Sequence, residues 1–298
     1  MNTIQLRAAV IALLAALFAI PNVAGADAVI KLAHPNRNDP FDNSTAAMAV
    51  VFKNVLETNS GGEIRVDIYP EGQLGKDTDV VKLVANDIIQ SAISSTVGVE
   101  RIYPLLGVLD LPFVFPSIAT TYAVLDGPFG QRLSADIARK TGLHVLGFGD
   151  SGGFFAITNS KRPIKSPADM AGLKIRTMGL ETHNVIVRSL GADAVPLAFS
   201  ELYAALKTGA VDGEINPVPV IRFAQLDQVQ KYLTATRLVI APYVWVMNGK
   251  FWDGLSAHDK ELVDDAARAA IIANRGVQSH PRGVGARVAG AQAAHGDL

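Results

Sequence analysis

An arginine inside a predicted strand is the residue whose type and position most directly suggest ligand chemistry. Arg176 lies in the segment 173–177, where strand alternation places it on the face opposite Leu173 and Ile175. An arginine near the end of a strand can point into a cleft, and its planar guanidinium suits a carboxylate held by two hydrogen bonds. The same side chain could instead pair with a neighbouring acid for structure alone, so two interpretations stay open.

Asn216 is a weaker candidate of the same kind. It follows a second predicted strand at 211–215 and precedes Pro217, so its amide can donate a hydrogen bond at the same cleft mouth. The other titratable residues suggest no reaction. The six histidines show no paired metal-ligand spacing, and no pair of carboxylates stands out as a general acid and base. We therefore expect a protein that is not an enzyme and that uses no cofactor and no metal.

Two glycine-rich motifs overlap in one short segment. Gly149-Asp150-Ser151-Gly152-Gly153 matches the pentapeptide around the nucleophilic serine of trypsin-like proteases, but no histidine lies in a suitable setting and that fold is all-β. Residues 147–152 also match the GxGxxG pattern of dinucleotide-binding turns, which must open a helix, whereas a strand-like run follows at 154–158. A tight turn explains the segment better than either activity.

Composition excludes several classes of protein. The 298 residues carry 27 Lys and Arg against 28 Asp and Glu, a net formal charge of −1, and they include no cysteine. Disulfide scaffolds and cysteine-ligated metal sites are therefore excluded, and we expect no nucleic-acid partner because no basic run is present. The length suits one large domain or two modest ones.

The first 26 residues are typical of a secretory signal peptide. Arg7 precedes an apolar run at 8–20, Pro21 ends that run, and Ala24-Gly25-Ala26 offers a small-residue cleavage site. The run is shorter than the ~20 residues that span a bilayer. We expect cleavage before Asp27 and a periplasmic mature protein; an uncleaved membrane anchor is the alternative.

The rest of the chain alternates between strand and helix patterns. Strands are predicted at 29–33, 64–69, 91–96, 144–148, 154–158, 173–177, 211–215 and 243–247, and helices at 44–58, 77–89, 118–125, 129–141, 181–190, 201–208 and 257–273. This alternation predicts an α/β fold with mixed or mostly parallel sheets. Residues 281–298 show no apolar periodicity and form an atypical tail, which we expect to be disordered or to replace a lost terminal element.

Several segments together resemble the solute-binding proteins of TRAP (tripartite ATP-independent periplasmic) transporters. The similarity is collinear over about 30–270. It is carried by 61–66 (GGEIRV), 69–75 (YPEGQLG), 111–117 (LPFVFPS), 166–176 (SPADMAGLKIR), 200–206 (SELYAAL), 209–217 (GAVDGEINP) and 251–256 (FWDGLS).

The resemblance implies a two-lobed periplasmic-binding-protein fold with the ligand in the cleft between the lobes. Lobe one would comprise 27–152 plus about 242–280, and lobe two 153–241. It further implies an organic acid as ligand and TRAP membrane permease subunits as partners. Arg176 would grip the ligand carboxylate, Asn216 would help to bind it and Phe199 would line the pocket. Phe155, Thr96 and Asn38 complete the set of expected ligand-binding residues.

One departure from the family pattern bears on the ligand. Many members have a second arginine in a GFRxxTN-like stretch, where this chain has Phe155. A missing cation and an added ring predict a monocarboxylate with an apolar or aromatic body rather than a dicarboxylate. Two alternatives to a TRAP receptor stay open: an ABC-type or sensor-coupled binding protein, and an exported hydrolase.

Overall fold

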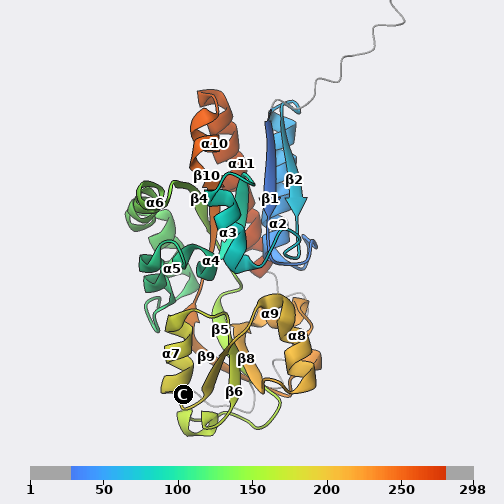
Figure 1. Cartoon of the computed structure of the whole chain (residues 1–298), viewed down its shortest axis with the longest axis vertical. Coiled ribbons are helices and arrows are strands. Elements are labelled where there is room, and N and C mark those ends of the chain that lie inside the picture. The colour runs from blue at the N-terminus through green and yellow to red at the C-terminus, as the bar shows by residue number, and fades with distance from the viewer. Residues whose placement is uncertain (1–27, 280–298) are drawn as a thin grey trace, which may run out of the picture.

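The computed structural model describes residues 28–279, which form two lobes, each built around one five-stranded sheet. Figure 1 shows the lobes one above the other along the long axis of the molecule. The predicted signal peptide (1–26) and atypical tail (281–298) lie outside the described residues. Within residues 28–279, no helix combines the length and the apolar character that crossing a bilayer requires.

Lobe one contains the sheet with strand order β2-β1-β3-β10-β4. Its strands are β1 (Ala28–Ala33), β2 (Ile64–Tyr69), β3 (Ser91–Ser95), β4 (Leu143–Gly149) and β10 (Tyr243–Asn248). Its helices are α2 (Ser44–Asn59), α3 (Asp77–Ala85), α4 (Thr96–Glu100), α5 (Ile118–Asp126), α6 (Pro128–Thr141), α10 (Gly249–Gly254) and α11 (Ala257–Ser279), with a 3₁₀ helix η1 (Pro104–Asp110).

Lobe two contains the sheet with strand order β7-β6-β8-β5-β9. Its strands are β5 (Phe154–Asn159), β6 (Lys174–Thr177), β7 (Asp193–Pro196), β8 (Gly213–Pro217) and β9 (Tyr232–Ile240). Its helices are α7 (Glu181–Ser189), α8 (Phe199–Thr208) and α9 (Val218–Phe223), with short 3₁₀ turns η2 (Pro167–Met170) and η3 (Leu226–Gln228).

Both sheets are mixed, and the same cause operates in each. In each sheet, the strand second from one edge follows a crossing of the chain from the other lobe. In lobe one this strand is β10, which comes after lobe two is complete, and in lobe two it is β5, which comes directly after β4. Each of these two strands runs antiparallel to both of its neighbours, whereas β1, β2 and β3, like β6, β7 and β8, pair in parallel. Exchange of strands therefore ties the two lobes together.

Each sheet is covered by apolar side chains on both faces. In lobe one, Trp245 of β10 is fully buried with Phe52 of α2 against the face that α2 and α11 cover, and a second cluster fills the opposite face. In lobe two, Ile175 of β6 packs with Val187 of α7, and Ala156 of β5 packs with Leu202 of α8 on the opposite side. Alternate residues of each strand thus meet different helices.

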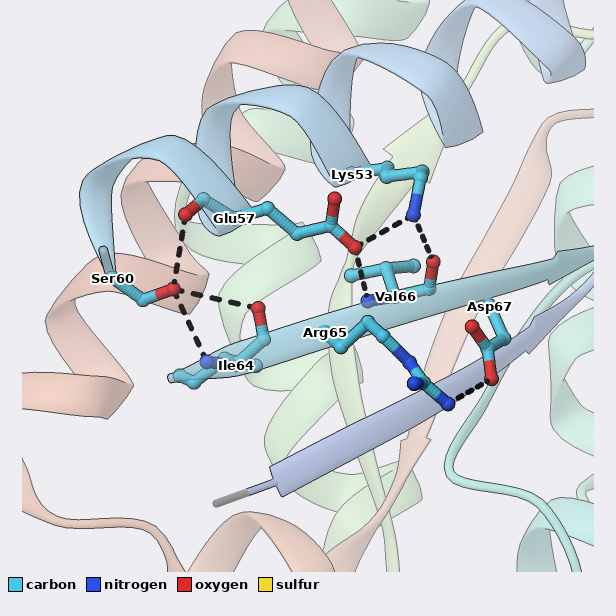
Figure 2. A network of polar contacts seen from close by, with 7 residues as sticks. All are labelled: Lys53, Glu57, Ser60, Ile64, Arg65, Val66 and Asp67. Carbon is cyan, nitrogen blue, oxygen red and sulfur yellow. Dashed lines mark hydrogen bonds and ion pairs between the residues drawn. The ribbon is translucent and has the colours of Figure 1, made fainter. Parts of the chain in front are cut away.

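The outer edge of the first sheet is closed by side chains rather than by another strand. Glu57 Oε1 accepts hydrogen bonds from Val66 N at 2.8 Å and from Lys53 Nζ at 2.6 Å, and Lys53 Nζ also donates to Val66 O at 2.6 Å (Figure 2). Farther along β2, Ser60 Oγ accepts from Ile64 N at 3.2 Å. Because an unpaired edge invites pairing with another chain, helix α2 protects β2 by satisfying its backbone groups.

The segment that matches protease and nucleotide-binding motifs is the connection between the two lobes. It follows β4 and leads into β5, so it opens no helix. Asp150 Oδ1 accepts hydrogen bonds from Gly152 N and Gly153 N, both at 2.8 Å, and Gly153 has a φ of +79°, which favours glycine. Ser151 Oγ donates to Ala241 O, next to the return crossing into β10. The motif is therefore a tight turn between the lobes, as the sequence favoured.

The buried carboxylate of Asp150 should carry much of the stability of this turn. Replacing it by alanine (Asp150→Ala) leaves two backbone N–H groups and the Tyr122 hydroxyl without their acceptor. We expect a loss of about 1–3 kcal/mol in the free energy of unfolding, measured by urea denaturation. Tyr122→Phe removes only the hydroxyl contact and should cost less; an equal loss in both variants would contradict this role for the turn.

Candidate ligand-binding site

A cavity lies between the lobes and receives side chains from both of them. Lobe two contributes Arg176, Asn216, Phe155 and Phe199 from β6, β8, β5 and α8. Lobe one contributes Asn36, Asp77, Ser95 and Tyr243. The carboxyl ends of the parallel strands β6 and β8 meet at this edge of the second sheet, which is where ligands commonly bind in α/β proteins.

Arg176 is the buried cation of this cavity, whereas Lys76, which also lines it, is exposed and paired with Glu201. The environment of Arg176 leaves part of its hydrogen-bonding capacity unused. The residue is 1% exposed, Nε donates to Leu197 O at 2.9 Å, and the guanidinium lies 6.0 Å from the centre of the Phe199 ring. Nη1 is buried and has no hydrogen-bond partner within the described residues. A buried donor without an acceptor is costly, so this geometry suits an incoming anion.

Glu214 is the nearest acidic residue along the strands, and sequence reasoning missed it. Its Cα pairs in register with that of Arg176 across β6 and β8. The carboxylate is fully buried and accepts hydrogen bonds from Thr158 Oγ1 at 2.6 Å and Asn216 Nδ2 at 2.5 Å. A sequence signal was available: Glu214 and Asn216 are two residues apart in one strand, so they must share a face.

The two interpretations of Arg176 can now be compared. No carboxylate oxygen of residues 28–279 forms an ion pair with its guanidinium; Glu214 and Asp77 act on it from farther away. Burial lowers the pKa of Arg176 to about 10, and these two carboxylates oppose the shift. Arg176 therefore remains cationic at neutral pH without a permanent partner in contact.

Lobe one presents oxygen-rich groups on its side of the cavity. Asp77, at the start of α3, accepts hydrogen bonds from Ser94 Oγ at 2.9 Å, from Ser95 Oγ, and from Ser95 N at 3.3 Å. Burial raises the pKa of Asp77, and these hydrogen bonds partly offset the shift. Nearby, Asn36 Nδ2 donates to Tyr243 OH at 2.8 Å. These groups can accept from or donate to ligand hydroxyls.

The expected site residues fall into two groups. Arg176, Asn216, Phe199 and Phe155 all line the cavity. Thr96 and Asn38 do not line it. Thr96 is fully buried at the start of α4, and Asn38 is exposed in the turn after β1. Their neighbours Ser95 and Asn36 occupy the positions that face the cavity.

Comparison with known proteins identifies the family. The model of the bacterial extracellular solute-binding proteins, family 7 (DctP), matches residues 38–278. The chain belongs to this family. The resemblance to TRAP solute-binding proteins is therefore confirmed, and with it the two-lobed fold.

Three relatives illustrate the range of the family. A solute-binding protein of Verminephrobacter eiseniae is 38% identical over 78% of this chain and 69% of its own length. The 2,3-diketo-L-gulonate-binding periplasmic protein of Escherichia coli is 32% identical over 74% of this chain and 66% of its own. The crystal structure of a TRAP periplasmic solute-binding protein from Polaromonas, bound to D-erythronate, has a TM-score of 0.80 at 32% identity and covers 85% of this chain and 82% of that one.

The buried acid beside Arg176 should make stability depend on pH in a defined direction. Burial raises the pKa of Glu214, so the folded protein binds more protons than the unfolded chain between the ordinary glutamate pKa and the raised one. The contribution of Glu214 to the free energy of unfolding should therefore fall as pH rises through that window. Urea denaturation of wild type and Glu214→Gln from pH 4 upward measures it, and a constant difference between the two proteins would contradict the assignment.

Proposed function

We propose that this solute-binding protein holds an organic acid by its carboxylate against Arg176 and presents it to a TRAP membrane permease. The observation that carries the proposal is the buried guanidinium in the interlobe cavity, with Nη1 lacking an acceptor. A ligand carboxylate would supply that acceptor and compensate the buried positive charge. The contact strengthens when closure of the lobes excludes water.

The rest of the cavity favours a ligand with one carboxylate and several hydroxyl groups. Opposite Arg176, lobe one offers the carboxylate of Asp77, which would repel a second acid, and the hydroxyl of Ser95, which can bind ligand hydroxyls. The rings of Phe155 and Phe199 pack along the carbon skeleton. This refines the expectation of an apolar or aromatic body: the rings are present, but so are buried polar groups.

The ligands of two relatives are compatible with this choice. D-Erythronate, bound in the Polaromonas structure, and 2,3-diketo-L-gulonate, named for the E. coli protein, each carry one carboxylate on a chain of oxygen-bearing carbons. Both would place an anion near Arg176 and oxygen atoms toward lobe one.

The proposed receptor works outside the cytoplasm and changes shape around its ligand. Family membership and the sequence of residues 1–26 support a periplasmic location. Lobe two turns relative to lobe one about the crossings at Asp150–Gly153 and near Ala241, which is the hinge closure of many binding proteins. Ligand shifts the equilibrium toward the closed form, and the permease would recognise that form.

A hydrolase would need a reactive serine, and Ser151 is unsuited to that role. It is 8% exposed, and its hydroxyl donates to Ala241 O within the hinge. Membership of family 7 also favours a TRAP receptor over an ABC-type or sensor-coupled protein.

Truncation of the central cation should abolish most of the affinity. Removing one partner of a buried charged pair costs about 2–5 kcal/mol, so Arg176→Ala should weaken binding by roughly 30- to 4000-fold. A thermal-shift screen of sugar acids and small organic acids first identifies the ligand, and calorimetry on refolded, ligand-free protein then measures its affinity. Arg176→Lys keeps the charge but loses the planar fork, so it should fall between wild type and alanine. Unchanged affinity in Arg176→Ala would refute the mechanism.

The selectivity against dicarboxylates should depend on Asp77. Asp77→Asn removes a negative charge that faces the ligand body while keeping a group of the same shape. We expect affinity for D-erythronate to fall about tenfold, the cost of one hydrogen bond to a charged group, while succinate binds better or unchanged. Calorimetry with both acids tests this, and a parallel loss for both would show that Asp77 acts only on the fold.

A further inference from the structure

Lys76 brings a second positive charge to the ligand cavity. Of the residues in 28–279 that line the cavity, Lys76 and Arg176 are the two cations. Lys76 belongs to lobe one, where it directly precedes α3, whereas Arg176 belongs to β6 of lobe two. The Lys76 side chain is 54% exposed, so it lines the part of the cavity that solvent reaches. Two cations that line one cavity from opposite lobes could bind an acid at both ends of a ligand.

An acid of lobe two already occupies this lysine. Lys76 Nζ lies 3.4 Å from Oε1 of Glu201, whose side chain is 49% exposed. Glu201 is in the first turn of α8, directly after Phe199 and Ser200, which both line the cavity. The lysine therefore begins a helix of the upper lobe in Figure 1, and the glutamate begins a helix of the lower lobe. The charge of Lys76 is offset by an acid of the protein rather than by an acid of a ligand.

Helix α8 fixes the position of the glutamate. Glu201 Oε2 accepts a hydrogen bond from Ala198 N at 3.3 Å, just before the first turn of the helix. The positive end of the helix dipole also stabilises a carboxylate at this place. One carboxylate oxygen thus anchors the side chain and leaves the other oxygen for Lys76. The lysine ammonium ends a flexible four-carbon chain, so it can turn toward whichever acceptor is available.

The other charged residues of the lining are acids. Asp77 accepts hydrogen bonds from Ser94 and Ser95, and Glu71 is exposed in the loop before Lys76. Within residues 28–279, neither of these acids forms an ion pair. If Arg176 holds the first carboxylate of a ligand, a second carboxylate can therefore find a positive charge in the lining only at Lys76.

We propose that Glu201 is a specificity-determining residue, which neutralises Lys76 and thereby disfavours acids that carry a second carboxylate. A dicarboxylate held at Arg176 would have to displace Glu201 from Lys76 and bring its own negative charge close to that of Glu201. A ligand with one carboxylate meets neither cost. The inference rests on the proposed binding of a carboxylate at Arg176, and it adds a cause of selectivity that is separate from the charge of Asp77.

Succinate and its monoamide, succinamate, are matched probes, because they differ by one charged group at nearly constant shape. Glu201→Gln removes the negative charge, while the glutamine can still accept the hydrogen bond from Ala198 N. We expect the ratio of succinate affinity to succinamate affinity to rise about two- to fivefold in this variant, the size expected when an exposed ion pair is released. Calorimetry on refolded, ligand-free protein measures both affinities, and glutarate with its monoamide extends the test to a longer ligand.

Two further variants separate the release of Lys76 from a general change of charge. Adding Lys76→Gln to Glu201→Gln should return the affinity ratio to the wild-type value or below, because the released cation is gone. Glu71→Gln removes an exposed acid of the lining that is not paired with Lys76, and it should raise the ratio less than Glu201→Gln does.

The outcomes distinguish this proposal from the proposed function. An unchanged ratio in Glu201→Gln, or a rise that survives the added Lys76→Gln, would overturn the role of Glu201. Equal changes for both probes would overturn it too, because the pair would then act on the contact between the lobes rather than on selectivity. If Arg176→Ala binds succinate and succinamate as tightly as wild type does, the proposed function itself is wrong, whatever the ratio.

Discussion

The burial of one guanidinium without an anion in contact is the constraint on which this structure depends. Arg176 is 1% exposed, and the acids that act on it, Glu214 and Asp77, lie in different lobes. A buried charge is tolerated when it is compensated, and here the compensation is distributed and incomplete. Nη1 of Arg176 has no hydrogen-bond partner within residues 28–279, and the residue lines the cavity between the lobes. A receptor for anions needs this incomplete compensation, because a fully paired arginine would have nothing left for a ligand.

The fold supplies the conditions for that arrangement. The chain crosses between the lobes just before β5 and just before β10, and each of these strands pairs antiparallel near one edge of its sheet. The backbone therefore joins the lobes, while each lobe keeps its own sheet. The carboxyl ends of β6 and β8 then face lobe one, which brings Arg176 and Asn216 opposite Asp77. The turn at Asp150–Gly153, which joins the lobes, has its own aspartate as the acceptor for the backbone N–H groups of Gly152 and Gly153.

The sequence predicted the regular elements well wherever a strand or helix buries one continuous face. The helix expected at 44–58 is α2 (Ser44–Asn59), and the strand expected at 64–69 is β2. Elements whose register depends on a partner were missed. Strand β7 has four residues and contains a proline, and β9 exposes several of its side chains, so neither shows a local pattern. Helix α3 ends at Ala85 rather than near residue 89 because Asp87, with a φ of +61°, turns the chain.

The sequence by itself determined the family, the α/β character, the grouping of Arg176 with Asn216, and the reading of 149–153 as a turn. These follow from residue order, since alternation and glycine placement act within a few positions. Only the tertiary structure decided that Glu214 and Asp77 share the environment of Arg176, and that Thr96 and Asn38 miss the cavity. Such relations join residues 38 to 99 positions apart, and their distances are set by how the sheets and helices pack, which no local pattern records.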